Sequence, residues 1–334
     1  MKKGILVAGH LCVDNMYPCR TYPKEGELTY VLEGIKKSTG GIINNTAKDI
    51  ARLAPDMPVS VSGCVGDDGD GDYIVSLLKE YPNIDVSGIR RAGRTGFTNV
   101  MTNEATKTRT FFQYSGANAL YSEDYLDLSA VSADILHIGY ILLLPALDAE
   151  DEEYGTKMAR LLHNAKKAGL RTSIDVVSET GGRTKKLVPP ALKFTDYCII
   201  NELEASAATG LPLRSPEGQL ITENLAPALR ALRSMGVSTW TVIHAPECAA
   251  GLNESGDFFR INSLKLPEGY IQGTTGAGDA FAAGVLVGAE KGLTLESALR
   301  LGICSAAASL KEADATSGVK EAEEVLKLYE MYGE

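Results

Sequence analysis

Short apolar runs alternate with amphipathic segments along most of the chain, and this alternation restricts the folds available to it. Residues 5–8 form a continuous apolar run, which is typical of a parallel strand covered on both faces. Residues 158–165 place apolar side chains at helical spacing, and a strand-like run follows at 172–177. A second helix followed by a strand is predicted at 225–235 and 239–244. The remaining predicted elements are a helix at 43–54, a strand at 59–63, a helix at 73–78 and three helices from Ala277 onward. The pattern predicts a three-layer, Rossmann-like α/β fold, in which helices flank both faces of a mostly parallel central sheet.

Two segments interrupt this alternation. Residues 16–35 mix tyrosines and leucines with charged residues and two prolines. A hairpin pattern without a following helix occupies 97–102 and 108–112. Strands of this kind cannot join the parallel sheet, so we expect them to build a small separate sheet. A surface hairpin is the alternative, although exposed aromatic residues such as Tyr30 and Phe111 would then lack a partner.

Length and charge exclude several classes of protein. At 334 residues, the chain is long enough for one large α/β domain or two smaller ones. Its net charge of −10 argues against a nucleic-acid partner, because nucleic-acid phosphates call for a basic face. No run of about 18 apolar residues occurs, so we expect neither a membrane span nor a membrane partner. The six scattered cysteines show no metal-ligand spacing and indicate reduced thiols in a cytoplasmic protein.

A glycine-rich stretch near the C-terminus carries the clearest chemical signal. Residues 273–284 read GTTGAGDAFAAG, and the glycines predict a loop over 273–278 that leads into a helix with Asp279 in its first turn. The start of a helix exposes unpaired N–H groups and a partial positive charge, which together bind anions and favour the ionised form of Asp279. A carboxylate beside bound phosphate can also take a proton from an attacking hydroxyl. The alternative is a turn whose aspartate only complements the helix dipole.

The same stretch resembles the C-terminal signature of the ribokinase-like (PfkB) carbohydrate kinases. Four further segments resemble motifs of that family in the same order, namely GGIINNTA at 40–47, VGDDGDG at 65–71, GAN at 116–118 and NELE at 201–204. The resemblance implies a single ribokinase-like kinase domain over residues 1–334. It also implies insertions at about 12–36 and 95–117 that form a β-sheet lid over the sugar site, and this lid is the expected contact of a homodimer.

The resemblance also assigns roles on the acceptor side. Asp279 becomes the general base, and the backbone amides of Gly276, Ala277 and Gly278 hold the transferring phosphoryl group. The residues expected to bind the sugar together with Asp279 are Asp14, Gly40, Gly41 and Asn45. A carboxylate such as Asp14 can accept hydrogen bonds from two hydroxyls, and an amide such as Asn45 both donates and accepts. A turn or cap role is the alternative for Asp14.

A second group is expected near the nucleotide phosphates of ATP and the Mg²⁺ that accompanies them. It comprises Asn201, Glu204, Thr274, Thr275 and Asp175. Because Mg²⁺ prefers oxygen ligands and keeps several waters, we expect Glu204 to act on the metal through water. The alternative for Glu204 is a helix cap, since it follows Asn201 at the capping-box spacing.

The chain departs from the family pattern at three places. Gly273 stands where many members carry the aspartate of a monovalent-cation site, so potassium activation stays open. Residues 244–248 replace both glycines of a turn that flanks the nucleotide. Ile42 replaces a lysine found in some ribokinases and sugar-phosphate kinases, which favours a neutral sugar or nucleoside over a sugar phosphate.

The sequence therefore predicts an ATP-dependent kinase that phosphorylates a hydroxymethyl group of a small sugar by in-line transfer. A nucleoside kinase of the same family is the first alternative, and aromatic walls for a base are available at Tyr17, Phe111, Phe112 and Tyr140. The second alternative is a non-catalytic sugar-binding or regulatory protein with the same fold. A pure binder has little need for the base at Asp279, so the kinase is preferred.

Overall fold

The computed structural model describes residues 4–106, 108–179 and 181–333, and its centre is a nine-stranded sheet. In spatial order the strands are β15 (Phe258–Asn262), β14 (Cys248–Leu252), β13 (Trp240–His244), β12 (Tyr197–Asn201), β11 (Arg171–Val176), β8 (Ile135–Ile141), β1 (Ile5–Gly9), β4 (Val59–Val65) and β5 (Ile84–Arg91). All neighbours from β13 to β5 are parallel, whereas β14 and β15 run antiparallel at one edge. The predicted mostly parallel sheet is confirmed.

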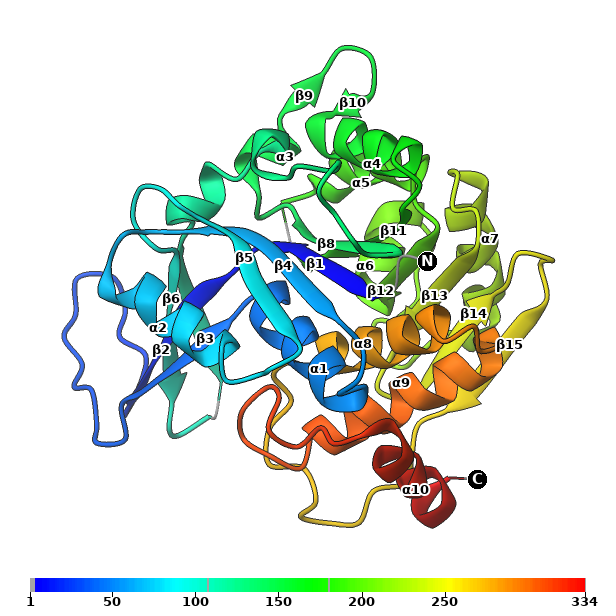
Figure 1. Cartoon of the computed structure of the whole chain (residues 1–334). Helices are drawn as coiled ribbons and strands as arrows, with labels where there is room; N and C mark the ends of the chain where they lie inside the picture. The colour runs from blue at the N-terminus through cyan, green and yellow to red at the C-terminus, as the bar shows by residue number, and fades with distance from the viewer. Residues whose placement is uncertain (1–3, 107, 180, 334) are drawn as a thin grey trace.

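Helices cover both faces of this sheet, and successive residues of β1 show why. Ile5 and Val7 join one apolar cluster, whereas Leu6 and Ala8 join the other, because neighbouring side chains of a strand point to opposite faces. The first cluster is completed by α1 (Lys48–Leu53), α2 (Gly69–Leu78), α8 (Ala277–Glu290), α9 (Leu295–Ser309) and α10 (Ala322–Tyr332). The second is completed by α3 (Pro145–Asp148), α4 (Lys157–Lys167), α5 (Thr184–Leu192), α6 (Glu202–Thr209) and α7 (Leu225–Ser234). The three layers are visible in Figure 1.

A separate four-stranded sheet lies at the left of Figure 1, where the sequence predicts the two insertions. Its strands in spatial order are β3 (Lys36–Gly40), β2 (Cys12–Cys19), β6 (Phe97–Asn103) and β7 (Arg109–Tyr114). The predicted hairpin is the antiparallel pair of β6 and β7. Several large apolar side chains of this sheet and its loops face solvent; Tyr30 is 75% exposed and Phe111 63%.

Three predicted helices differ in detail from the structure. The helix predicted at 73–78 is α2, which begins four residues earlier, at Gly69. The helix expected at 43–54 begins with a π-helical turn at Ile43–Ala47 and continues as α1. Helix α8 begins at Ala277, two residues earlier than the loop prediction allowed, because Gly276 already provides the left-handed turn at φ 79°. The three predicted C-terminal helices are present as α8, α9 and α10.

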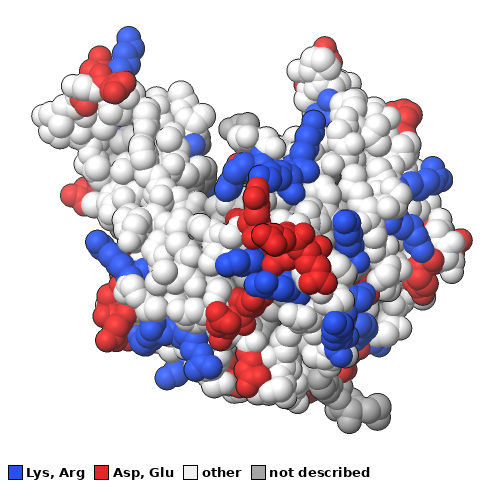
Figure 2. All heavy atoms as spheres, turned by 90° about the horizontal axis from the view of Figure 1, so that it is seen from above, with Lys and Arg blue, Asp and Glu red and all other residues white. Residues whose placement is uncertain are grey.

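The described helices and the surface add two observations. None of the described helices is long and apolar enough to cross a membrane. Figure 2 shows Lys and Arg interspersed with Asp and Glu over the face it presents, so the described residues there form no extended basic patch.

Candidate active site

The glycine-rich loop meets α8 in a conformation that few side chains permit. Gly276 has a φ of 79°, and a Cβ on it would lie 2.4 Å from the Cβ of Ala315. Gly278 lies in the first helical turn, where a Cβ would lie 3.3 Å from Cε1 of His244. The first amides of a helix have no intrahelical acceptor, so this turn presents N–H groups to a ligand. The loop can therefore bind an anion such as a phosphoryl group.

This loop lies between two cavities, and its consecutive threonines face different ones. Thr275 lines a cavity of about 780 Å³ together with Asp14 and Asn45, and we call it the acceptor cavity. Thr274 lines a second cavity of about 830 Å³ with Gly278, and we call it the nucleotide cavity. The anion-binding turn thus borders two spaces large enough for two different reactants. Another cavity, of about 710 Å³, surrounds Gly4 and residues 53–58 and does not include the loop.

Asp279 is held by three hydrogen-bond donors. Asn45 donates from Nδ2 to Oδ2 at 2.9 Å, Tyr140 donates its hydroxyl to Oδ1 at 2.7 Å, and the Thr46 hydroxyl lies 3.4 Å from Oδ1. Burial raises the pKa of Asp279, and the donors from Tyr140, Asn45 and Thr46 partly offset that rise. The sequence argument expected the helix start to favour the ionised form; here burial outweighs it, since the side chain is almost fully enclosed.

Asp14 belongs to strand β2 rather than to a turn, so the alternative cap role is wrong. Its side chain occupies the space above Gly40, where a Cβ would lie 2.2 Å from Asp14 Oδ2. Gly41 has a φ of 89°, and a Cβ there would lie 2.7 Å from Nδ1 of His10. Burial raises the pKa of Asp14, which lines the acceptor cavity with Asn45. The two glycines are therefore needed for Asp14 and His10 to fit.

Asn44 and Asn45 have different tasks. Asn44 donates from Nδ2 to the carbonyl of Gly40 at 2.8 Å, which ties the helical turn back to strand β3. Asn45 faces the acceptor cavity and bonds Asp279. The structure thus brings Asp14, Asn45 and Asp279 to one site, as the sequence predicts.

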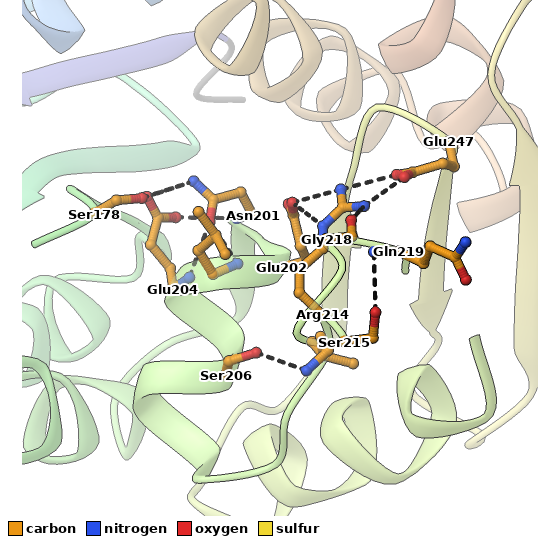
Figure 3. Close-up of polar contacts among 12 residues, drawn as sticks. Ser178, Asn201, Glu202, Glu204, Ser206, Arg214, Ser215, Gly218, Gln219 and Glu247 are labelled. Carbon is orange, nitrogen blue, oxygen red and sulfur yellow. Dashed lines mark hydrogen bonds and ion pairs between the residues drawn. The ribbon is translucent and has the colours of Figure 1, made fainter. Parts of the chain in front are cut away.

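Asn201 and Glu204 form a capping box at the start of α6 (Figure 3). Asn201 Oδ1 accepts from the amide of Glu204 at 2.9 Å, and Glu204 Oε2 accepts from the amide of Asn201 at 3.0 Å. Glu204 Oε1 also accepts from the Ser178 hydroxyl at 2.9 Å. The capping alternative considered for Glu204 is therefore realised. Its role toward a metal stays a prediction.

Asp175 stands at the end of β11 close to these acidic groups. Burial, followed by the charges of Glu204 and Asp279, raises its pKa well above the usual range. Burial also raises the pKa of Glu204 to about 7. Among the described residues, no group of three or more His, Cys, Asp or Glu could hold a metal ion by itself. These carboxyls fit a Mg²⁺ that is bound mainly by nucleotide phosphates and water.

The nucleotide cavity has an edge that the sequence could not supply. Residues 245–247 turn the antiparallel hairpin of β13 and β14, and Arg214 joins this turn to α6 by bonding both Glu247 and Glu202 (Figure 3). The ring of His244 packs on Phe281 with centroids 4.8 Å apart. Burial lowers the pKa of His244 to about 4, so the imidazole is neutral at pH 7. The ion pairs of Arg214 thus hold this turn at the place where the family pattern has glycines.

Three contacts were missed by the sequence argument. Tyr140 was considered only as an aromatic wall, yet its hydroxyl reaches Asp279. Thr46 follows Asn45 in the same turn, and only the fold shows that it faces Asp279. Arg109 donates from Nη1 to the Thr275 hydroxyl at 2.7 Å and so links the small sheet to the glycine-rich loop. No motif indicates Tyr140 or Arg109, because both contacts depend on distant segments meeting in space.

An α/β sheet with a second small sheet, an anion-binding turn between two cavities and a buried aspartate in the helix that follows this turn form the arrangement of a sugar kinase. A profile of the pfkB family carbohydrate kinases matches residues 2–322, and the chain belongs to this family of phosphotransferases.

Individual relatives have low sequence identity to this chain but align with most of its length. An adenosine kinase of Schizophyllum commune is 26% identical over 292 residues, covering 84% of this chain and 79% of the relative. A ribokinase of Arabidopsis thaliana is 25% identical over 338 residues, covering 97% and 80%. The solved structure of Arabidopsis thaliana ribokinase complexed with ribose and ATP superposes with a TM-score of 0.79 at 23% identity, covering 98% and 99%. That superposition establishes the shared fold.

Proposed function

We propose that this chain transfers the terminal phosphoryl group of ATP to a hydroxymethyl group of a small sugar. The observation that carries the proposal is the position of the glycine-rich turn between the two cavities, with Asp279 in the first turn of α8. Asp279 bonds Asn45, which lines the acceptor cavity, so the base stands at the acceptor side. The complexes with ribose and ATP or with ADP known for ribokinases support the same assignment of reactants.

The reaction follows from this arrangement. Asp279 takes the proton of the acceptor hydroxyl, whose oxygen attacks the terminal phosphorus while the bond to the departing ADP oxygen breaks. The amides of Gly276, Ala277 and Gly278 stabilise the charge on the transferring group. Asp14, Gly40 and Gly41 position the sugar. Magnesium bound with the nucleotide would neutralise phosphate charge.

The nucleotide side of the proposal rests on a second set of residues. Asn201 and Thr274 line the nucleotide cavity, and we assign them to the nucleotide phosphates. Thr275, which the sequence places in the same set, lines the acceptor cavity instead. Glu204 bonds Asn201 and lies close enough to Asp175 to raise its pKa, and we assign both carboxyls to the water shell of the metal. Because its partner Asn201 lines the nucleotide cavity, we assign Glu204 to that shell through water.

A nucleoside acceptor is the second candidate. Phe111 and Tyr73 line the acceptor cavity and could stack on a base. An adenosine kinase is among the relatives. A non-catalytic binder is disfavoured, because a binder has no use for a buried aspartate held by three donors.

We also propose a homodimer formed through the small sheet. The exposed apolar side chains of this sheet and its loops include Leu28, which is 82% exposed, and Phe111 and Phe112. Such a surface is usually covered by a partner. Light scattering should give a dimer, and Phe112→Glu should give a monomer. A wild-type monomer at micromolar concentration would contradict this part of the proposal. The cytoplasmic location stays a prediction of the sequence.

The test of function is ADP release from Mg-ATP with a panel of sugars, sugar acids, sugar phosphates and nucleosides. Turnover with a sugar supports the proposal, and turnover with nucleosides alone transfers it to the second candidate. Ligand-induced thermal stabilisation without any turnover would favour the non-catalytic protein.

A further inference from the structure

The acceptor cavity contains a buried lysine that forms no ion pair with any residue that the structure describes. Lys48 lies in the first turn of α1 and is only 7% exposed. Its Nζ donates to the Thr39 hydroxyl at 2.9 Å, and no carboxylate of the described residues forms an ion pair with it within 4.0 Å. A buried charge is costly unless it is paired, so this ammonium group calls for an explanation.

Lys48 keeps its charge near neutral pH. Burial lowers its pKa to about 8, and the more distant charges of Asp49, Glu80 and Asp314 partly oppose that effect, whereas Arg52 adds to it. None of these groups neutralises Lys48 by contact. Asp314 is the only one of these four groups that lines the cavity, and its carboxylate already accepts hydrogen bonds from Thr316 and Ser317 in its own turn.

The other cations of the cavity differ in their partners. Lys36 and Lys37 also line the cavity, and Lys37 forms an ion pair with Asp70 at 2.5 Å, so the charge of Lys37 is balanced. Arg109 also lines the cavity, and its guanidinium group donates to the neutral hydroxyl of Thr275. Among the described residues, neither Lys48 nor Arg109 has a carboxylate within ion-pair distance, although the carboxylates of Asp14, Glu312 and Asp314 also line this space.

We propose that the acceptor carries an anionic group, a carboxylate or a phosphate, that binds to the ammonium group of Lys48. Asp14 then bonds hydroxyls of the same molecule, and its hydroxymethyl group reaches Asp279. Ligand binding completes the pairing that the protein leaves open, and Arg109 adds a second cation.

This inference rests on the proposed function and replaces the expectation of a neutral sugar. That expectation came from Ile42, which is fully buried in the core. The fold supplies a cation from another position, Lys48, which lies six residues further along the chain. A neutral sugar would enclose Lys48 more deeply without pairing it, which costs binding energy.

The experiment compares KM values for D-fructose, D-fructose 6-phosphate, D-gluconate and 2-dehydro-3-deoxy-D-gluconate, each of which has a free hydroxymethyl group. The variant is Lys48→Met, which keeps the length of the side chain and removes its charge. The control is Lys79→Met, an exposed lysine at the end of α2 that does not line the cavity. The phosphate and carboxylate arms identify which anion is bound.

In the wild type, an anionic acceptor should have a KM at least about tenfold below that of D-fructose. Lys48→Met should raise that KM about tenfold or more, change the D-fructose and ATP values less than about twofold, and leave the ligand-free Tm equal or higher. A lower Tm with equal KM changes for all acceptors would show that Lys48 only holds Thr39. A change confined to the KM of ATP would assign Lys48 to the nucleotide. Either result overturns the inference.

Failure of the inference and failure of the proposed function are distinguishable. Turnover that is best with neutral acceptors and insensitive to Lys48→Met overturns the inference alone. Absence of all turnover overturns the kinase proposal, and thermal shifts then decide the binding question. Stabilisation by an anionic acceptor in the wild type but not in Lys48→Met would still support the anion site, and no shift would refute it.

Discussion

Removal of one hydroxyl group, in Tyr140→Phe, should change how Asp279 titrates. The Tyr140 hydroxyl donates to Oδ1 at 2.7 Å and opposes the effect of burial on the pKa of Asp279. A donor to a carboxylate favours the ionised form, so its loss raises the pKa further. The base must be ionised to accept a proton, and the acidic limb of the kcat/KM profile should therefore move to higher pH.

The magnitude follows from the strength of the lost bond. A hydrogen bond to a charged group contributes about 1.5–3 kcal/mol, and we take the lower end because Asn45 and Thr46 remain. That energy corresponds to about a tenfold loss of kcat/KM on the acidic limb. Above the limb, where Asp279 is ionised in both proteins, the difference should shrink to a few-fold.

The assay is initial-rate kinetics between pH 5 and 9, because kcat/KM reports the ionisation of the free enzyme. Tyr125→Phe is the control, since its ring packs on Tyr121 with centroids 6.0 Å apart and it makes no bond to Asp279. An unchanged acidic limb in Tyr140→Phe, with equal losses at all pH values, would refute the reasoning and leave Tyr140 a packing role only.

Two further predictions concern stability and the loop. Asp49 is fully buried, and neither of its carboxylate oxygens has a hydrogen-bond partner among the described residues. Burial, then the charge of Asp279, raises the pKa of Asp49 well above the usual range. The pKa of Asp49 is higher in the folded state than in the unfolded state, so the protein loses stability as the pH rises between these two values. In urea titrations, Asp49→Asn should therefore raise the free energy of unfolding by about 1–2 kcal/mol at pH 7.5 and by less at pH 4.5. No gain at pH 7.5 would contradict this. Gly276→Ala should lower kcat/KM at least about tenfold and lower the Tm, because the new Cβ would lie 2.4 Å from the Cβ of Ala315. The control is Gly256→Ala, since Gly256 has a φ of 86° and a Cβ there would have no atom within 4 Å. This control should show backbone strain alone and keep full activity. Equal activity of both variants would argue against the tight turn.

Much of the fold was readable from periodicity, because apolar spacing and glycine stops are local properties of the chain. Strand β8 illustrates the limit of this approach, because it contains Tyr140, whose hydrogen bond to Asp279 joins residues 139 positions apart. Periodicity also misplaced the start of α8, where Gly278 could be read as loop or helix.

The candidate site divides in the same way. Asp279, Asn45 and Asp14 lie in recognisable motifs, and the fold brings them together. Lys48 has no motif, and its importance appears only when burial and missing partners are known. No local pattern predicts the ion pairs of Arg214 with Glu202 and Glu247, which hold the turn where the family pattern has glycines.

The central claim is that Asp279 is the base of a phosphoryl transfer, and Asp279→Asn tests it most directly. Single-turnover formation of ADP should fall by about 10²–10⁴-fold, whereas calorimetric affinity for the acceptor should stay within a few-fold, because the amide keeps the shape but cannot take the proton. A variant that retains more than about a tenth of the wild-type rate with unchanged acceptor affinity would contradict the account.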